Sequence, residues 1–395
     1  MQDTVILGYA RTPMGSLMGT LKDQSASDLG AVAIRAAVQS AARGAALNAA
    51  DVDRVLMGSV LLGGQGQAPA RQAALKAGLS DHTPCTTISK VCGSGMEAMI
   101  LGHSALQSGL SKLVIAGGME SMSNAPYLLP KERGGARIGH GVTVDSMFFD
   151  GLEDHYGDKG RLMGSFGDAV ARDYGFSRES QDSFAIETLH RARAAQQNGA
   201  FDGEIAAVAT RTGEVRTDEQ PAKADPQKIP ALRPAFGTDG TITAANASSI
   251  SDGAAALVLA RADYAKDCGA VPIARICGVS AHAGAPKDFP KAPVPAMRRL
   301  MDRLGWGIAD IDLFEVNEAF AMVAMIAMAD LGIPHDKLNV NGGACALGHP
   351  IGASGARICV TLLHALETRG LKRGIAGICI GGGEATAIAI ERLAP

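Results

Sequence analysis

The sequence predicts a layered α/β protein whose sheet is mainly parallel. Short apolar runs that suit buried strands alternate with segments that carry apolar residues at helical spacing. The 395 residues include 49 glycines, whereas only 4 % are aromatic, and this composition favours closely packed layers over an all-β sandwich. A chain of this length is expected to form two or three domains, or one large layered domain.

The predicted elements follow one another in a regular order. In the first part, strands are expected over Val5–Tyr9, Val52–Met57 and Lys112–Ala116, and helices over Asp28–Ala42 (behind Ser27 as the N-cap), Ala70–Ala77 and Gly93–Ser108. In the last part, strands are expected over Pro272–Val279, Ile311–Val316, Gly374–Ile380 and Thr386–Ile390, and helices over Val294–Leu304, Ala319–Leu331 and Ser354–Arg369.

The two parts share more than their element order. Ala50–Asp53 precedes a predicted strand in the first part, and the similar Ala309–Asp312 precedes one in the second. Likewise, Ser-Gly pairs at 94 and 354 open predicted helices, and Gly-Gly pairs at 117 and 381 follow predicted strands. Landmarks that recur in one order at nearly constant separation indicate an internal duplication, although such short strings also match by chance.

Different material lies between the two parts. Residues 121–245 carry proline, glycine and charge in irregular order, with one amphipathic helix expected over Arg178–Gln197. Loop-rich insertions on a rigid scaffold often contact substrates. We therefore place the domains at residues 1–120, 121–250 and 251–395.

Charge and hydropathy exclude several classes of partner. The chain has 37 basic and 40 acidic side chains, a net charge of −3, so nothing favours binding to nucleic acid. No apolar run approaches the ~18–20 residues that span a bilayer, and the first ten residues suit a strand better than a signal peptide. The sequence predicts a cytoplasmic protein without a nucleic-acid or membrane partner.

Seven cysteines are spread along the chain. Their number is odd and no Cys-x-x-Cys pair occurs, which argues against a disulfide framework and against a zinc ribbon. We expect reduced thiols and no metal site. The default interpretation of each thiol is a small buried residue; the seven are Cys85, Cys92, Cys268, Cys277, Cys345, Cys359 and Cys379.

Two segments suggest a nucleophile and a base. Cys92 stands where a helix begins, and unpaired N–H groups and the helix dipole favour a thiolate there, although a structural thiol in a tight turn fits as well. His349 is the only titratable side chain of useful pKa in the glycine-rich loop Asn341–Gly355, which makes it a candidate general base.

Two further side chains stand at predicted strand ends. Cys379 precedes three glycines whose N–H groups could face an oxyanion, but a packed thiol is the plainer interpretation. Asn317 could hold a water or a carbonyl, yet capping the next helix is the simpler role. Ligands of open α/β sheets bind at this edge, and a thiolate, a base and a second proton carrier together suit acyl transfer through a thioester.

The sequence resembles the thiolase family over essentially its whole length. Each matching stretch alone is modestly specific, but all of them in order are very specific. The stretches are Val91–Gly95, Gly117–Ser123, Ala125–Tyr127, Arg233–Phe236, Ala245–Ser248, Asp252–Ala255, Asn317–Phe320, Gly348–Pro350 with Gly352 and Ser354-Gly355, and Cys379 with Gly381–Gly383.

The resemblance implies a five-layered αβαβα fold, built from two duplicated βαβαβαββ halves with an inserted loop domain. It implies a ping-pong reaction, most like that of the acetyl-CoA acetyltransferases, in which two acetyl-CoA reversibly give acetoacetyl-CoA and CoA. Cys92, activated by His349, would carry the acetyl group, and Cys379 would move a proton at the second α-carbon. No cofactor would be bound permanently, and relatives suggest a homotetramer, although dimer and tetramer stay open.

The resemblance also assigns binding roles. One oxyanion site would be formed by His349 and a water on Asn317, and the other by the backbone N–H groups of Cys92 and Gly381. The coenzyme and the acyl group would contact Ser248, Ala247, Lys223, Leu152, Phe236, Met163, Ala319 and Phe320.

Some positions depart from the family pattern. Leu162 stands where many relatives have histidine, Ser249 and Glu384 replace glycines, and Ala222 replaces an arginine, so that Lys223 beside it is expected to contact phosphate instead. The Leu162 change leaves acyl-chain preference open. The direction of the reaction is open because cleavage and condensation share one active site, and the pathway and any effect of a monovalent ion are open as well.

Other functions remain open at this point. The nearest rival is a 3-ketoacyl-CoA thiolase that degrades longer chains. A condensing ketoacyl synthase would need two histidines around the cysteine, whereas here the second partner is Cys379. A non-catalytic CoA- or lipid-binding protein of the same fold is the non-enzyme alternative.

Overall fold

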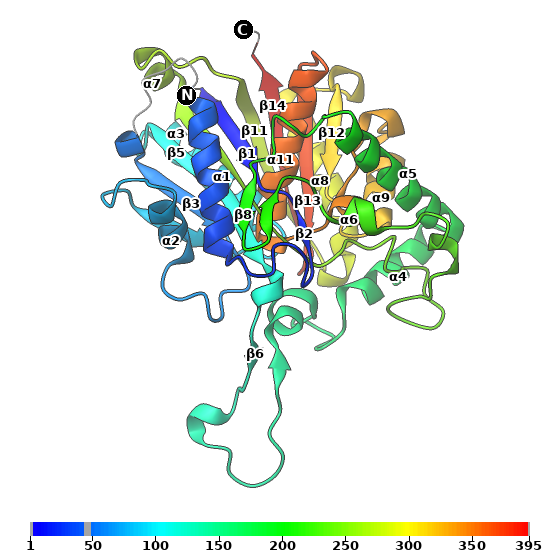
Figure 1. Cartoon of the computed structure of the whole chain (residues 1–395). Coiled ribbons are helices and arrows are strands. Elements are labelled where there is room, and N and C mark those ends of the chain that lie inside the picture. Colours follow the sequence, from blue (N-terminus) through cyan, green and yellow to red (C-terminus); the bar gives the residue numbers. More distant parts are fainter. Residues whose placement is uncertain (1–2, 43–48, 394–395) are drawn as a thin grey trace.

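The computed structural model describes residues 3–42 and 49–393. Within these ranges ten strands form one sheet in the order β12-β13-β14-β11-β1-β10-β5-β3-β4, with β2 beside β10 (Figure 1). The strands are β1 Thr4–Arg11, β2 Gly15–Ser16, β3 Arg54–Gly58, β4 Cys85–Ile88, β5 Leu113–Ser121, β10 Ser251–Arg261, β11 Ala274–Ala283, β12 Leu313–Val316, β13 Arg373–Ile380 and β14 Glu384–Arg392.

The sheet consists of two halves with the same strand order. The order β4-β3-β5-β10-β1 of the first half recurs as β12-β13-β14-β11 in the second, where a parallel bridge from Phe314 to Leu338 takes the place of β4. Within the sheet, strand pairing joins the two halves at two residue pairs between β1 and β11. The predicted duplication is therefore confirmed.

One side-chain contact occurs in both halves. Asp53 accepts hydrogen bonds from the backbone N–H groups of Lys112 and Leu113, at 2.6 and 3.0 Å. Asp312 accepts from Lys372 and Arg373 in the same way, at 2.9 and 2.8 Å. The recurring Asp-containing strings noted in the sequence thus join equivalent strands, β3 to β5 and β12 to β13.

The prediction of a mainly parallel sheet is wrong. Only the pairs β3–β4, β3–β5 and β12–β13 are parallel, and the other pairs of the sheet are antiparallel. The three-glycine connection from β13 to β14 is too short for a crossover, so it forces an antiparallel hairpin. Strand β10 was not predicted because its alanine-rich stretch has a single β-branched residue, Val258, of the kind that marks strands.

The helices and the two sheet halves form five layers, with one apolar core under each outer helix layer and a third core around the central helices. Helices α1 (Ala26–Ala41) and α2 (Pro69–Lys76) cover the outer face of the first half, and α8 (Pro293–Leu304) and α9 (Ala321–Leu331) cover that of the second (Figure 1). Helices α3 (Ser94–Gln107) and α11 (Ile351–Thr368) pack between the sheet halves. Residues 351–366 of α11 are all buried, as expected of a helix in a central layer.

Several local predictions need correction. The N-cap of α1 is Ser25, not Ser27, and its hydroxyl accepts from the Asp28 N–H in a capping box. Helix α11 begins at Ile351, so Ser354 lies in its first turn. The glycines at 117 and 118 lie inside β5 and not in a turn after it. In the second half, the residue that corresponds to Gly117 is Gly377, which lies inside β13.

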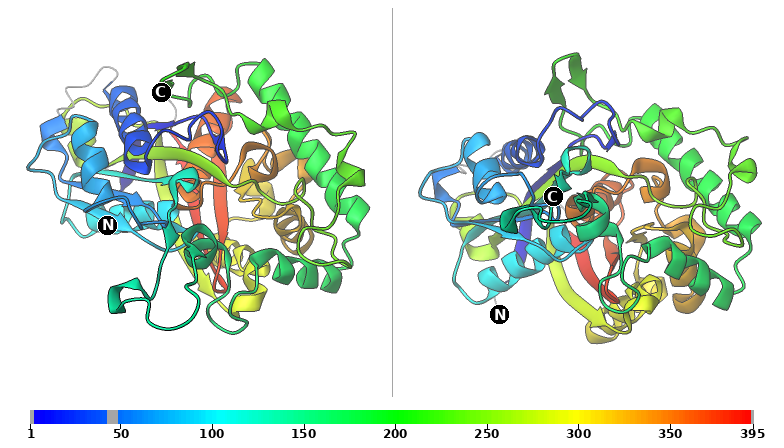
Figure 2. Two further views of the ribbon diagram at one scale, coloured as in Figure 1. Left: turned by 60° about the horizontal axis from the view of Figure 1, so that its bottom comes forward. Right: turned by 90° about the horizontal axis from the view of Figure 1, so that it is seen from below.

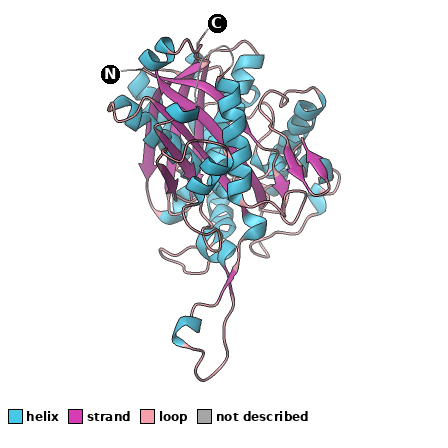
Figure 3. Ribbon diagram, turned by 60° about the vertical axis from the view of Figure 1, so that its left-hand side comes forward, coloured by secondary structure: helices cyan, strands magenta, loops and turns pink. Residues whose placement is uncertain are grey.

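The segment between β5 and β10 is rich in loops. A hairpin with the short strands β6 (Tyr127–Leu128) and β7 (Val144–Asp145) projects from the body (Figures 1 and 3). Helix α5 matches its predicted bounds, Arg178–Gln197, and lies beside α9 (Figure 2). The other elements outside the main layers are a π-helix at Phe148–Leu152, α4 Met163–Asp173, β8 Val208–Thr210, β9 Gly213–Val215, α6 Gln220–Lys223, α7 Ala262–Asp267 and α10 Ala344–Leu347.

The predicted domain boundaries can be compared with the strand pairing. Strand β10 begins at Ser251, where the third segment was placed, but it pairs with β1 and β5 of the first half. The pairing favours a boundary after Arg261, and the boundary at 251 stays a prediction. Residues 1–2 and 394–395, at the outer ends of the first and third segments, lie outside the described residues.

Candidate active site

A cavity of about 500 Å³ lies where the loop-rich segment meets the second half. Seven of the residues predicted to bind substrate line it: Leu152, Met163, Phe236, Ala247, Ser248, Ala319 and Phe320. The Phe236 and Phe320 rings meet edge to face, with centroids 6.0 Å apart. Leu162 and Ser249, which depart from the family pattern, also belong to the lining. The cavity is thus mostly apolar, as small-molecule sites are.

Lys223 is the predicted binding residue that lies outside this lining. Its ammonium group pairs with Glu219 at 2.5 Å, and the carboxylate of Glu219 also accepts from the backbone of Ser16 and Thr20. Gln220, one turn earlier on α6, does line the cavity. A contact of Lys223 with phosphate stays a prediction, and it would have to compete with Glu219.

Cys92 sits in a strained turn between β4 and α3. Val91, the residue before it, has φ +45°, a left-handed conformation that β-branched residues rarely adopt. The Ser94 hydroxyl holds the turn closed, because it accepts from the Lys90 N–H at 2.8 Å and donates to the Val91 carbonyl at 2.6 Å. Gly93 has no side chain because a Cβ there would lie 2.3 Å from Ile380. Strain of this kind is typical of functional sites.

The environment of Cys92 disfavours a resting thiolate. Burial, with a smaller contribution from the charge of Glu120, raises the pKa of the Cys92 thiol to about 11. The backbone N–H groups of Gly381 and of Cys92 itself lower this pKa but do not outweigh burial. This environment favours the thiol over the thiolate expected at the helix start, so the thiol needs a base to react.

The second cysteine lies close to the first. Cys379 ends β13 and is almost fully buried. Burial raises the pKa of its thiol well above the ordinary value, and the nearby Cys92 raises it further. Both thiols thus hold their protons near neutral pH.

His349 is arranged as a base. Its Nδ1 lies 2.6 Å from the Ser354 hydroxyl, which itself donates to the Pro350 carbonyl at 2.9 Å. Because the hydroxyl hydrogen is committed, Nδ1 carries the proton and Nε2 keeps a lone pair. Burial, and then the charge of Arg357, lower the pKa of His349 to about 3. Nε2 is buried and has no hydrogen-bond partner among the described residues.

Asn317 follows β12 and does not cap the next helix. Helix α9 begins only at Ala321, and Phe320 occupies its N-cap position. Both polar atoms of the Asn317 side chain are buried without a partner among the described residues, so the capping interpretation is wrong. Buried amides of this kind are seldom left without a partner, which fits a group reserved for a ligand or a water.

Glu120 belongs to this region but was given no role from the sequence. Its buried carboxylate accepts from the backbone N–H groups of Val60, Leu61 and Gly352, at 2.9, 3.2 and 3.0 Å. It thereby joins the end of β3 to the start of α11, two residues after Pro350. Burial raises the pKa of Glu120 to about 7. An acid inside an otherwise apolar strand was the available signal.

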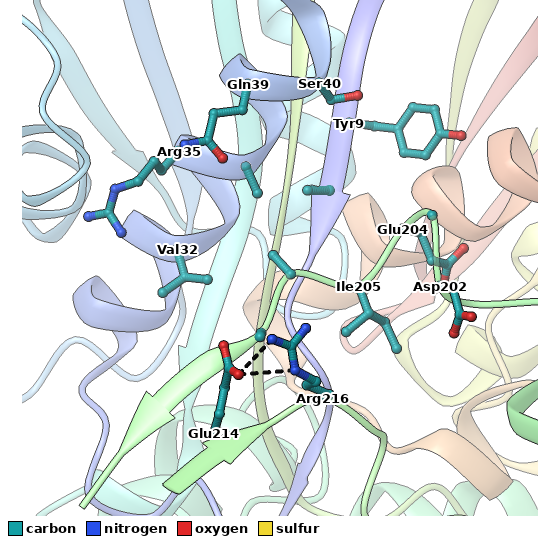
Figure 4. A pocket seen from close by; sticks show the side chains of 15 residues that line it. Tyr9, Val32, Arg35, Gln39, Ser40, Asp202, Glu204, Ile205, Glu214 and Arg216 are labelled. Atoms are coloured by element: carbon teal, nitrogen blue, oxygen red, sulfur yellow. Dashed lines mark hydrogen bonds and ion pairs between the residues drawn. The ribbon is translucent and has the colours of Figure 1, made fainter. Parts of the chain in front are cut away.

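A second large cavity holds none of the predicted residues. It measures about 550 Å³ and lies between α1 and the segment 202–216 (Figure 4). Its lining mixes charges, and Arg216 pairs with Glu214 there at 2.6 Å. The cavity beside Met163 and Phe236 is the candidate active site, because Cys92 packs in one apolar cluster with Phe148 and Leu152 of its lining. Within the described residues there is no cluster of acidic, histidine and cysteine side chains that could hold a metal ion. No helix in the described ranges is long and apolar enough to cross a membrane.

Comparisons with known proteins agree with this geometry. Residues 4–263 match the family model described as "Thiolase, N-terminal domain", and residues 270–392 match "Thiolase, C-terminal domain". The chain is 46 % identical to the acetyl-CoA acetyltransferase of Escherichia coli over 100 % of both chains, and 46 % identical to the probable acetyl-CoA acetyltransferase of Dictyostelium discoideum over 100 % of this chain and 95 % of that one. The Acat5 thiolase of Ascaris suum, solved in complex with coenzyme A, superposes with a TM-score of 0.94 at 41 % identity, covering 99 % of this chain and 100 % of that one.

Proposed function

This chain belongs to the thiolase family, and on that premise we propose that it is an acetyl-CoA C-acetyltransferase. It condenses two acetyl-CoA to acetoacetyl-CoA and CoA, and it catalyses the reverse reaction at the same site. The similar proteins named acetyl-CoA acetyltransferases and the coenzyme A complex of the Ascaris relative support this proposal.

The first half-reaction is acyl transfer to Cys92. His349 Nε2 takes the thiol proton, the sulfur attacks the thioester carbonyl, and the C–S bond to CoA breaks. The proton on His349 then passes to the departing CoA thiolate, and acetyl-Cys92 remains. The observation that carries the proposal is the neutral His349, whose Nδ1 is committed to Ser354 while Nε2 keeps its lone pair.

Two backbone donors suit the oxyanion of this step. The N–H groups of Cys92 and Gly381 both donate hydrogen bonds to the Cys92 sulfur. This supports their placement around the acetyl oxygen. The second oxyanion site, at His349 with a water on Asn317, receives the carbonyl of the other thioester. The unpartnered amide of Asn317 supports this assignment.

Cys379 moves the proton of the second half-reaction. In the cleavage direction, His349 takes the Cys92 proton, the Cys92 sulfur attacks the 3-keto carbon, and the C–C bond breaks. The Cys379 thiol protonates the enolate of the leaving acetyl-CoA, and the acetyl group left on Cys92 passes to CoA by the reverse of the first half-reaction. Condensation is the reverse, with Cys379 as the base. Its raised pKa supports this role, because the resting thiol already holds the proton that cleavage needs.

The cavity favours short acyl groups. Met163 lies near Gly381, where an added Cβ would be 3.5 Å from the Met163 sulfur, and the paired rings of Phe236 and Phe320 fill part of the same lining. The alternative is a thiolase for longer 3-ketoacyl chains. Leu162 is apolar where many relatives have histidine, and this difference supports the alternative. Turnover on a ladder of 3-ketoacyl-CoA lengths decides, since comparable rates on long chains would support the alternative.

Trapping the acyl-enzyme tests the proposal. Incubation with labelled acetyl-CoA should place the label on Cys92, and Cys92→Ser should abolish it. Cys379→Ala should still form the acyl-enzyme but lose condensation by about 100-fold or more. Label on another cysteine would contradict the mechanism. A protein that binds CoA but takes no label would be the non-catalytic binding protein instead.

The remaining assignments are assembly, cofactor and compartment. We place the enzyme in the cytoplasm as a homotetramer, with CoA thioesters as substrates, no permanent cofactor, and no nucleic-acid or membrane partner. The projecting hairpin supports assembly, because Leu129, Ile138 and Val142 are exposed on it. Light scattering should give the mass of four chains, and a smaller mass would contradict the tetramer.

A further inference from the structure

An ion pair connects the two turns that carry the candidate cysteines. The Lys90 ammonium lies 2.5 Å from the Glu384 carboxylate, and the two side chains are 27 % and 39 % exposed. Lys90 is two residues before Cys92, and Glu384 follows the glycine turn after Cys379. The partners therefore come from opposite halves of the duplicated fold.

Lys90 is fixed to the Cys92 turn through its backbone. Its N–H donates to the Ser94 hydroxyl at 2.8 Å, and its carbonyl accepts from the Gly93 N–H at 3.0 Å. Only the strained Val91 separates it from Cys92. A displacement of Lys90 would thus be passed on to the nucleophile.

Glu384 is fixed to the glycine turn in the same way. It is the first residue of β14 and pairs with Ile380 of β13 and with Ala283 of β11. Next to it, the Gly383 carbonyl accepts from the Gly284 N–H at 2.9 Å. This turn carries Gly381, whose N–H donates a hydrogen bond to the Cys92 sulfur.

We propose that the Lys90–Glu384 ion pair is a positioning device that holds the Gly381 N–H against the thioester of Cys92. Lys90 and Glu384 are positioning residues and not catalytic ones, because they act through the two turns. A partly exposed pair contributes little to global stability, but a small displacement of an oxyanion donor lowers the rate of acyl transfer. The inference rests on the proposed function, since it assigns these residues to the same acyl-transfer step.

The test uses the full-length enzyme with Lys90→Met, Glu384→Gln, the double variant, and the exchanged pair Lys90→Glu with Glu384→Lys. Lys76→Met is the control, because Lys76 pairs with Asp28 between α1 and α2 at 2.7 Å with similar exposure, away from the cysteines. Single-turnover acetylation of Cys92 and the KM for acetyl-CoA are measured for each. Melting temperatures establish that each variant is folded.

Each single variant should acetylate Cys92 about three- to tenfold more slowly, with KM within about twofold of the wild type. The double variant should be no slower than the single ones, the exchanged pair should regain part of the rate, and Lys76→Met should be unchanged. Wild-type rates in the folded single variants would overturn the inference, as would additive losses without any rescue. Failure of the proposed function would appear differently, as a wild-type enzyme that takes no label at Cys92.

Discussion

The protonation of Cys92 follows from competing local effects. The helix start and two backbone N–H groups favour the thiolate, but burial prevails and raises its pKa to about 11. His349, with a pKa lowered to about 3 by burial and by Arg357, stays neutral throughout the range in which the enzyme is handled. The resting state therefore holds a neutral thiol and a neutral imidazole, not a preformed thiolate and imidazolium.

This arrangement predicts the pH profile of Cys92 alkylation. Iodoacetamide reacts with the thiolate, so the native rate should rise about tenfold per pH unit from pH 7 to pH 10, without a plateau. The same cysteine in denatured protein should level off near its ordinary pKa of about 8.5. Mass spectrometry of the peptide that contains Cys92 measures both rates. A native plateau below pH 8 would show that the helix dipole, not burial, decides the protonation state.

Among the elements, predictions from the sequence succeeded where local pattern determines the structure. Helix α5 was predicted with both bounds, because Ser177 caps it and Gly199 follows its end. Strand β10 was missed because its burial on both faces comes from tertiary packing and not from alternation. The glycines at 117 and 118 suggested a turn, since glycine pairs usually mark one, but here they allow close packing.

In the candidate site, too, some residues were identified from the sequence and others were not. Cys92, His349 and the residues of the acyl cavity were identified from motifs and from the resemblance. Glu120 and the Lys90–Glu384 pair were not, because their partners are distant in sequence and only the folded chain brings them together. The role of Asn317 was open in the sequence because a strand-ending asparagine usually caps a helix, and the start of α9 at Ala321 removes that role.

The approach of α11 to β5 is the element contact that can be tested most directly. A Cβ at Gly118 would lie 2.1 Å from the Gly352 carbonyl oxygen and 2.9 Å from the Ala353 Cα. Both atoms are backbone, so no side chain can move aside. Gly118→Ala should therefore destabilise the fold by about 3 kcal/mol and lower the melting temperature by about 4 °C.

The first turn of α11 follows directly after His349, so the folded Gly118→Ala variant should also acetylate Cys92 more slowly. Gly134→Ala is the matched control, because a Cβ there meets nothing within 4 Å. Calorimetry on both variants makes the comparison. Equal melting temperatures for Gly118→Ala and the wild type would mean that α11 does not press on β5 as described.

At the scale of the whole molecule, buried acidic groups lie where the central helix α11 meets the sheet. Glu120 joins the start of α11 to the first half, and Glu315 of β12 faces Arg357 of α11 at 3.7 Å. Burial raises their pKa values from 4.5 to about 7 and about 8. Near neutral pH the folded chain keeps about half of the Glu120 proton and most of the Glu315 proton, whereas the unfolded chain has released both.

Stability should therefore fall as the pH rises from about 6.5 to 8. In this range the folded state holds more protons than the unfolded state, and the free energy of unfolding decreases by up to about 1.4 kcal/mol per pH unit for each such group. His349 acts in the opposite sense, but only below about pH 6.5, because its folded pKa is about 3 and its unfolded value is 6.5.

Calorimetric melting temperatures should decline between pH 6.5 and 8, and Glu315→Gln should flatten the decline because its amide cannot ionise. Glu132→Gln, a change of an exposed carboxylate on the projecting hairpin, should leave the slope unaltered. A wild-type melting temperature that stays level or rises between pH 6.5 and 8 would mean that these carboxyl groups are already ionised in the folded protein.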